Sequence, residues 1–337
     1  MRVLFILCGI ILIGCRQSAN HSSKTKQDRF SIEIIDNEAL ALLDKDAEIL
    51  EIGSGFSWTE GPLWVADGNY LLFSDIPNNI IYKIDAAGET SEFLRPSGFT
   101  GSISRKGELG SNGLLLNEHG ELVLMQHGDR RVAKMQATLN YQKPVFTSMV
   151  DKYQGKKLNS PNDGTYDTEG NLYFTDPPYG LLEGVKDPSK ELDFQGVYCL
   201  NTSLELRLID DSISRPNGLA LSVDEKQLYV AVSDPGHAVW YRYDIVSGCE
   251  VSNKTLFYDV SHLVGKPGQQ GLPDGMKMHS KGYLFATGPG GLWIFNKSAI
   301  PIARIYTGEA TSNCTFSKDE KTLFLTADDY VLKVALK

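Results

Sequence analysis

Six oxygen-bearing side chains recur at regular intervals along the 337-residue chain, each in a short polar corner that precedes an apolar stretch. They are Glu60, Asn112, Asn162, Asn217, Asp274 and Asn313. Carboxylate and amide oxygens are hard donors, and Ca²⁺ binds six to eight such oxygens in proteins. If the six corners converge, the sequence predicts a divalent metal site, with Ca²⁺ favoured over Zn²⁺, Mn²⁺ or Mg²⁺.

The same corners have an ordinary explanation as turns, because Asn-Gly and Asp-Gly pairs are common turn formers. Two features favour the metal interpretation. Every equivalent position carries an oxygen donor, and the first carries Glu60, a poor turn former. Prolines also directly precede Asn162, Asn217 and Asp274 and restrict the backbone there.

The corners recur because the chain repeats one unit six times. Successive corners lie 52, 50, 55, 57 and 39 residues apart. Each unit holds two short apolar stretches around a polar turn, then a third stretch rich in β-branched and aromatic residues, and in five units a fourth. Repeats of this length with four strands are typical of β-propeller blades.

The sixth unit stops after its third strand, at Lys337. Residues 47–52, AEILEI, lie upstream of the first unit and can supply the missing strand. Closing the ring in this way leaves no open sheet edge between the last and first blades. The sequence therefore predicts an all-β protein, a single six-bladed β-propeller over residues 31–337, closed by an N-terminal strand.

A second set of polar residues ends the second strand of each hairpin. Antiparallel pairing brings these ends beside the corners. The set includes Asp176 and His127, and a histidine can transfer a proton or bind a sugar hydroxyl near neutral pH. We expect both residues to bind substrate. A turn-forming role for Asp176 and a solvated role for His127 are the alternatives.

The first 14 residues have the pattern of an export signal. The apolar run from Val3 to Ile13 is shorter than the roughly 20 residues that span a bilayer. Its end, Leu12-Ile13-Gly14-Cys15, resembles the lipobox of bacterial lipoproteins, which implies cleavage before Cys15 and lipid attachment to it. An ordinary secretory signal is the alternative. Residues 15–30 are polar and predict a flexible tether. We expect an exported, periplasmic lipoprotein that meets the membrane only through its lipid.

Net charge and cysteine spacing exclude other classes. The formal charge is −9 and no run of Lys or Arg is present, so nucleic acid is not an expected partner. Beyond Cys15 the cysteines are Cys199, Cys249 and Cys314, without the C-x-x-C spacing of a zinc knuckle. One disulfide is compatible with this count, but buried thiols in strands are the favoured interpretation.

Five motifs together resemble the gluconolactonase and regucalcin (senescence marker protein) family of sugar lactone hydrolases. They are EGPLW at 60–64, NSPNDG at 159–164, FTDPPYG at 174–180, RPNG at 215–218 and LPDGM at 272–276. The resemblance covers nearly all of the chain from about residue 34. It implies a six-bladed propeller with a divalent metal and a small-molecule sugar lactone as substrate.

The resemblance also implies roles for individual residues. It implies that Glu60, Asn217 and Asp274 hold the metal, and that Asn162 either binds the metal or contacts the substrate beside it. Asn112 and Asn313 receive no family role and are expected to be structural. Animal members carry an arginine where this chain has Ser160, so its contacts with the substrate must differ.

The expected reaction is metal-assisted opening of a lactone such as glucono-1,5-lactone to gluconate. Asp274 is the expected base for the attacking water, and Asp163 is the reserve candidate. Direct attack by Asp274 on the carbonyl is a further alternative. The same site could act on other esters or phosphotriesters, or the protein could be a calcium-stabilised binding propeller without catalysis.

Overall fold

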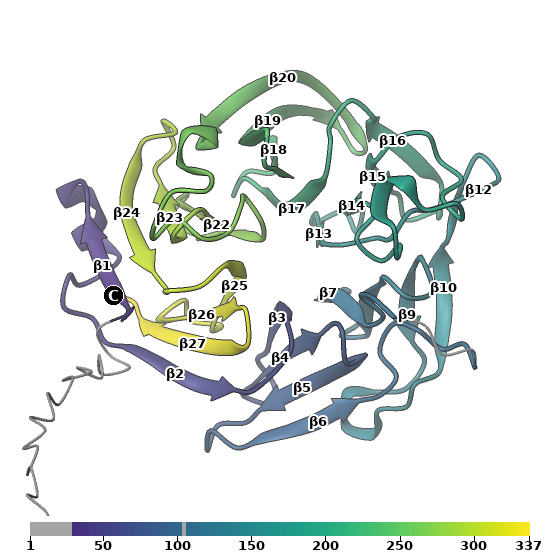
Figure 1. Ribbon diagram of the computed structural model, residues 1–337, viewed down its shortest axis with the longest axis horizontal. Coiled ribbons are helices and arrows are strands. Elements are labelled where there is room, and N and C mark those ends of the chain that lie inside the picture. Colours follow the sequence, from purple (N-terminus) through teal and green to yellow (C-terminus); the bar gives the residue numbers. More distant parts are fainter. Residues whose placement is uncertain (1–28, 103–105) are drawn as a thin grey trace, which may run out of the picture.

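The computed structural model describes residues 29–102 and 106–337 of the chain. These residues form six sheets of four or five antiparallel strands, arranged as a ring around a central axis (Figure 1). In each sheet the strand nearest the axis is the first of its unit. The predicted all-β class and six-bladed propeller are therefore confirmed.

The first three blades follow one another along the chain, with β11 (Lys152–Tyr153) and β12 (Lys156–Lys157) as a small hairpin before the third. Blade one contains β3 (Thr59–Val65), β4 (Tyr70–Asp75), β5 (Ile80–Ile84) and β6 (Thr90–Leu94). Blade two contains β7 (Ser111–Leu116), β8 (Leu122–Gln126), β9 (Arg131–Met135) and β10 (Phe146–Val150). Blade three contains β13 (Gly164–Tyr166), β14 (Leu172–Asp176), β15 (Gly196–Leu200) and β16 (Leu206–Asp210).

The remaining blades complete the ring. Blade four contains β17 (Pro216–Leu221), β18 (Gln227–Asp234), β19 (His237–Ser247) and β20 (Glu250–Asp259). Blade five contains β21 (Met276–Met278), β22 (Leu284–Gly288), β23 (Gly291–Phe295) and β24 (Pro301–Tyr306). Blade six contains β25 (Thr311–Phe316), β26 (Thr322–Ala327) and β27 (Tyr330–Ala335). Short 3₁₀ helices lie in connections, namely η2 (Asn37–Ala41), η3 (Leu139–Tyr141), η4 (Gly184–Lys186) and η5 (Ser261–Leu263).

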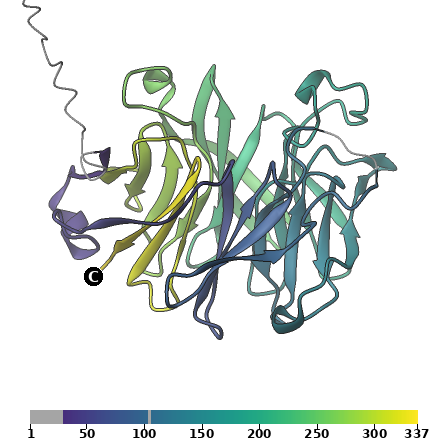
Figure 2. The same cartoon turned by 60° about the horizontal axis from the view of Figure 1, so that its bottom comes forward.

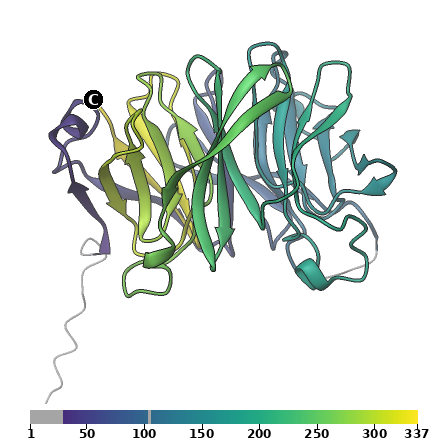
Figure 3. The same ribbon diagram turned by 90° about the horizontal axis from the view of Figure 1, so that it is seen from above.

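An N-terminal strand closes the ring, as the sequence predicts. Strand β2 (Ile49–Ser54) pairs antiparallel with β27, with Ile49 opposite Val334. The sequence did not indicate β1 (Ser31–Ile34), which adds a fifth strand to blade five by pairing with β24. The segment from β1 to β2 lies on the outside of the ring beside the C-terminal strands (Figure 2, Figure 3).

The core lies between neighbouring blades, because each sheet packs against the next on both faces. Middle strands such as β15 and β22 are buried along their whole length. This explains why the sequence shows apolar runs with only partial alternation. The largest fully buried side chain is Trp240, whose ring lies 5.4 Å from that of Phe295 in the next blade.

A disulfide joins blades three and four, where the sequence favoured free thiols. Cys199 in β15 bonds to Cys249 in the turn between β19 and β20, with their Cα atoms 5.4 Å apart. The two cysteines are 50 residues apart and lie in neighbouring blades. The expectation was therefore wrong for this pair, and Cys314 alone is a buried free thiol among the described residues.

The predicted signal peptide at 1–14, the lipid-bearing Cys15 and most of the tether at 15–30 lie outside the described residues. The last two tether residues contact the propeller: Arg29 pairs with Glu51 at 2.7 Å, and the Phe30 ring lies 6.0 Å from that of Tyr330. Within 29–102 and 106–337, no helix is long and apolar enough to cross a membrane.

Candidate active site

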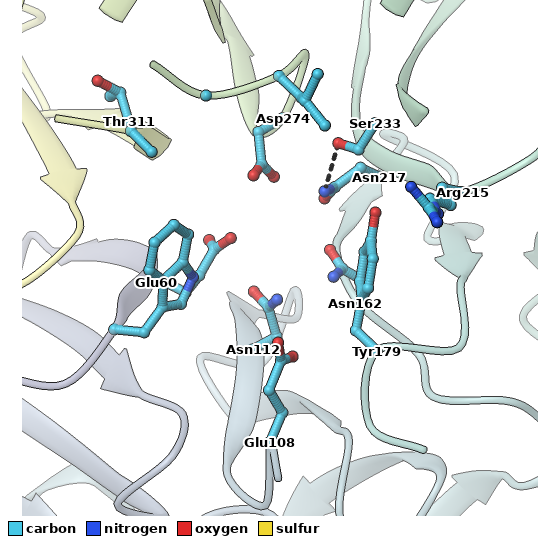
Figure 4. A pocket seen from close by; sticks show the side chains of 14 residues that line it. Glu60, Glu108, Asn112, Asn162, Tyr179, Arg215, Asn217, Ser233, Asp274 and Thr311 are labelled. Atoms are coloured by element: carbon cyan, nitrogen blue, oxygen red, sulfur yellow. Dashed lines mark hydrogen bonds between the residues drawn. The ribbon is translucent and has the colours of Figure 1, made fainter. Parts of the chain in front are cut away.

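A cavity of about 270 Å³ lies where the inner strands of all six blades meet. Five of the six predicted corners line it: Glu60, Asn112, Asn162, Asn217 and Asp274 (Figure 4). The sixth corner, Asn313, does not line the cavity. The residues that the repeat pattern singled out therefore converge, although they are spread over more than 200 positions of the chain.

The inner strands carry irregularities that place the corner residues. The pairing of β3 with β4 shifts register between Glu60 and Leu63, and equivalent shifts occur in β7 and β17. A β-bulge of this kind bends a strand and redirects a side chain. Glu60, Asn112 and Asn217 all lie within such bulges, so their side chains depart from the alternation of a regular strand.

Two motif glycines are required because the inner strands approach each other closely at the axis. Gly61 has φ +52°, and a Cβ there would lie 2.1 Å from the carbonyl oxygen of Asn112. A Cβ on Gly275 would lie 2.0 Å from Cγ of Asn313. Any larger residue at either position would push neighbouring blades apart. The glycines of the EGPLW and LPDGM motifs thus set the width of the site.

Four side-chain oxygens of cavity residues are buried without a hydrogen-bond donor in the described part of the chain. They are Oδ1 of Asn112, Asn162, Asn217 and Asp274. The Asn217 amide is oriented by its Nδ2, which donates to Oγ of Ser233 at 2.9 Å (Figure 4). Leaving a buried acceptor unpaired costs about 1–3 kcal/mol. A bound cation would satisfy these oxygens, so the residues present fit a divalent metal ion.

The pKa values of the Glu60 and Asp274 carboxyl groups also fit a bound cation. Burial, opposed by a hydrogen bond from the Gly61 N–H and reinforced by the charge of Asp163, raises the pKa of Glu60 to about 8. Burial and the neighbouring charge of Glu60 raise the pKa of Asp274 well above its usual value. Two carboxylates held together in a buried site are stable in ionised form only with a positive partner.

The donor set also bears on which cation fits. Among the described residues there is no group of three or more His, Cys, Asp or Glu side chains that could hold a metal. The cavity instead brings the buried carboxylates of Glu60 and Asp274 together with three asparagine amides, and the partly exposed Glu108 also lines it. Zn²⁺ prefers nitrogen and sulfur ligands, whereas Ca²⁺ accepts carboxylate and amide oxygens. The chemistry of the site therefore suits Ca²⁺ better than Zn²⁺.

Asp163, the reserve base, does not line the cavity. It is 2 % exposed, and its Oδ1 accepts a hydrogen bond from the Gly164 N–H at 2.8 Å. Its Oδ2 accepts from Nδ2 of Asn313 at 3.1 Å, and Asn313 also bonds to Glu60. Asp163 and Asn313 thus form a polar network that supports Glu60.

Asp176 does not line the cavity either. Its carboxylate accepts hydrogen bonds from the backbone N–H groups of Asn159 at 2.8 Å and Ser160 at 2.7 Å. Burial raises its pKa to about 7, and these two bonds oppose the rise. Asp75 makes equivalent contacts with the N–H groups of Ser57 and Trp58 in blade one. The aspartates that end β4 and β14 therefore anchor the loops that lead to the cavity.

His127 is fully buried and reaches the cavity only through another residue. Its Nδ1 lies 2.9 Å from Oε2 of Glu108, and Glu108 lines the cavity. His127 is neither a solvated residue nor part of the cavity wall.

Residues 58–329 match the SMP-30/Gluconolactonase/LRE-like region family. The chain belongs to this family. It is 39% identical over 301 residues to a gluconolactonase of Zymomonas mobilis, a match that covers 88% of this chain and 83% of that protein. Regucalcin of Homo sapiens is 23% identical over 273 residues, covering 79% of this chain and 82% of its own.

A gluconolactonase structure from Xanthomonas campestris has the same architecture. It superposes with a TM-score of 0.77 at 27% identity and covers 91% of this chain and 95% of its own. The family expected from the five motifs is therefore confirmed, as is the propeller that the family implies.

Several residues that line the cavity were not predicted from the sequence. They are Trp58, Glu108, Tyr179, Arg215, Ser233, Gly271, Leu272, Ala310 and Thr311. Tyr179 and Arg215 belong to the DPPYG and RPNG motifs, so their positions carried a signal. Glu108 and Trp58 lie in loops before the inner strands, outside the repeated unit, and no pattern marked them.

Ser160, which departs from the animal members of the family, has a structural explanation. Its Oγ donates to the carbonyl oxygen of Pro177 at 2.5 Å and accepts from the Gly180 N–H at 2.9 Å. These bonds hold both sides of Tyr179, whose ring lines the cavity. A guanidinium is nevertheless present at this cavity, because Arg215 lines it.

Proposed function

We propose that this chain is a metal-dependent lactonase that opens sugar lactones of the glucono-1,5-lactone class to the corresponding acids. The observation that carries the proposal is the convergence of five oxygen-bearing side chains, from five blades, on one cavity. Similarity to the Zymomonas mobilis gluconolactonase over most of both chains supports the reaction class.

We infer that the cation is Ca²⁺, held by Glu60, Asn162, Asn217 and Asp274, with Asn112 as a further oxygen donor. The unpartnered Oδ1 atoms of the three asparagines and Asp274, and the raised pKa values of the two carboxyl groups, support this set. When bound, such a cation polarises the lactone carbonyl and offsets the negative charge that forms on its oxygen. The chain's own residues supply the orientation and the proton transfer.

Asp274 is the proposed base. It lines the cavity, whereas both oxygens of Asp163 are engaged outside it. In its ionised form the Asp274 carboxylate takes a proton from the water that attacks the lactone carbonyl. The ring C–O bond then breaks, and Asp274 returns the proton to the leaving ring oxygen, which becomes a hydroxyl group. Direct attack by the carboxylate is the alternative route. Single turnover in ¹⁸O-water separates them, because only covalent attack places label in Asp274.

Other residues that line the cavity can contact a sugar ring. Trp58 lines the cavity as well. Tyr179 presents an aromatic ring to it and Arg215 presents hydrogen-bond donors (Figure 4). A pyranose-like lactone has apolar C–H faces and polar hydroxyl edges, so it can contact both kinds of side chain.

Acid release from glucono-1,5-lactone, followed in a pH-stat, tests the proposal. Protein treated with EDTA should lose its activity, and Ca²⁺ should restore it. Asp274→Ala should reduce the enzymatic rate at least 1,000-fold, on the order expected for loss of both a base and a metal ligand. The exposed Glu118→Ala serves as a matched control. Unchanged hydrolysis in Asp274→Ala would refute the site assignment.

A second candidate substrate class comes from a relative. The chain is 27% identical over 180 residues to the diisopropyl-fluorophosphatase of Loligo vulgaris, covering 51% of this chain and 55% of that protein. Measuring kcat/KM for a panel of lactones, aryl esters and phosphotriesters shows which substrate class the protein prefers. Tight Ca²⁺ binding with no turnover of any of them would favour the non-enzymatic binding propeller.

We also propose that the protein is exported and held at a membrane by lipid on Cys15. The lipobox-like sequence supports this, and so does the Cys199–Cys249 disulfide, since structural disulfides are typical of oxidising compartments. Expression with a radiolabelled fatty acid should label the wild-type chain but not Cys15→Ala. Membrane retention of the unlabelled variant would contradict the proposed anchor.

A further inference from the structure

Glu108 stands apart from the oxygen donors of the proposed metal site. It lines the same cavity, but its side chain is 36% exposed, whereas Glu60 is 2% exposed. It lies in the loop before β7, outside the repeated corner pattern. A carboxylate in this place can accept hydrogen bonds from a molecule that occupies the cavity.

His127 holds that carboxylate in place. Its Nδ1 lies 2.9 Å from Oε2 of Glu108, which is within ion-pair distance. A fully buried ring at this distance limits the orientations that the Glu108 carboxylate can adopt. Without such a partner, a partly exposed glutamate loses rotamer freedom when it binds a ligand, which weakens binding.

The histidine itself cannot move. It is 0% exposed. Its backbone N–H donates to the carbonyl oxygen of Gly110 at 3.1 Å, and its backbone carbonyl accepts from the backbone N–H of Arg130 at 3.2 Å. Gly180 packs against it so closely that a Cβ there would lie 2.8 Å from Cβ of His127. The buried histidine therefore has little room to shift, and it lies between Gly180, which follows Tyr179, and Glu108.

Donors and acceptors lie on separate sides of the cavity. Tyr179 and Arg215 lie together on one side, and Glu108 approaches from another (Figure 4). A ligand with several hydroxyl groups can donate to the carboxylate while it accepts from the guanidinium. A lactone without hydroxyl groups displaces water from the carboxylate and donates no hydrogen bond in return, which is unfavourable.

We propose that Glu108, fixed by His127, is a specificity-determining residue that selects hydroxylated lactones by accepting hydrogen bonds from ring hydroxyl groups. The proposal rests on the lactonase function argued above. It assigns Glu108 to substrate recognition and His127 to positioning, and it places neither residue among the groups that bind the cation or transfer the proton of the attacking water.

The test compares two six-membered lactones, glucono-1,5-lactone and the unsubstituted δ-valerolactone, with Ca²⁺-loaded protein. Glu108→Ala should lower the ratio of kcat/KM for the hydroxylated over the unsubstituted lactone by about 10- to 100-fold. His127→Gln should lower the same ratio less, mainly through a higher KM. Glu118→Ala is the matched control, because Glu118 also pairs with a histidine, His119, but on an exposed turn.

An unchanged ratio in Glu108→Ala, or an equal loss for both lactones, overturns the proposal, since equal loss marks a general catalytic or structural role. Melting temperatures within 2 °C of the wild type identify folded variants. If a variant unfolds, Glu108→Gln repeats the comparison with nearly the same shape.

Binding of the hexitol D-glucitol, measured by calorimetry, separates this proposal from the lactonase function. Loss of glucitol binding in Glu108→Ala supports hydroxyl recognition even if the wild type opens no lactone. Absence of turnover in the wild type would contradict only the lactonase function. Glucitol binding that is equal in wild type and Glu108→Ala overturns the specificity role.

Discussion

The side-chain oxygen of Asn112 is buried in the cavity wall and has no hydrogen-bond donor in the described part of the chain. Under the proposed function, a cation is the partner of this oxygen. Asn112→Ala should therefore lower Ca²⁺ affinity about 10-fold, a size typical of a supporting metal contact. Calorimetric titration of the variant measures it, with the exposed Gln136→Ala as the control amide. Unchanged affinity would return Asn112 to a structural role.

Glu60 makes cation binding depend on pH. Burial raises its pKa to about 8 in the protein without cation, so at pH 6 a proton occupies the carboxylate that the cation needs. Ca²⁺ affinity should rise about 10- to 100-fold from pH 6 to pH 8 and level off above it, with protons released on binding. Titrations in buffers of different ionisation enthalpy detect this release. Affinity that is flat across this range would contradict the assignment.

The raised pKa of Glu60 also determines whether the free energy of unfolding rises or falls with pH. A carboxyl group with a raised pKa binds its proton more tightly in the folded than in the unfolded chain. Its contribution to stability is present below its ordinary pKa of about 4.5 and is lost as pH rises through about 8. The free energy of unfolding of the cation-free protein should therefore fall over this range, while added Ca²⁺ stabilises it more at higher pH.

Among the elements, the loops that enter the cavity depend on buried aspartates at strand ends. Asp176, at the end of β14, accepts two backbone N–H groups from the loop that carries Asn162. Asp176→Ala leaves both donors buried without a partner and should lower the free energy of unfolding by about 2–4 kcal/mol. Urea unfolding measures this loss. A loss of substrate affinity without any loss of stability would instead favour direct substrate contact.

The sequence predicted the elements that repeat and missed those that do not. The inner strands, the corners at Glu60 and Asp274, and the closing strand follow from a periodic pattern that each blade must satisfy. Strand β1 and the loop that carries Glu108 occur once, so no repeat could reveal them. The Cys199–Cys249 pair was missed because contact between blades depends on relative strand heights, which a sequence pattern does not specify.

The whole ring depends on its closure by β2, which pairs with β27 and joins the two ends of the chain. Deleting residues 1–54 removes β1 and β2 and leaves β27 as an exposed edge that can pair with other chains. This protein should aggregate, whereas deletion of residues 1–28 should leave the melting temperature within about 2 °C. Size-exclusion chromatography and thermal melting compare the two. A soluble, monomeric 55–337 fragment would show that closure is dispensable.

The six blades position five oxygen donors around one point, and the central claim is that lactone opening takes place at a cation held there. Stepwise titration of cation-free protein with Ca²⁺, with acid release from glucono-1,5-lactone as the readout, tests this claim most directly. The predicted result is a rate that rises linearly and saturates at one Ca²⁺ per chain. A full rate without any cation, or one equivalent of bound Ca²⁺ with no turnover, would contradict it.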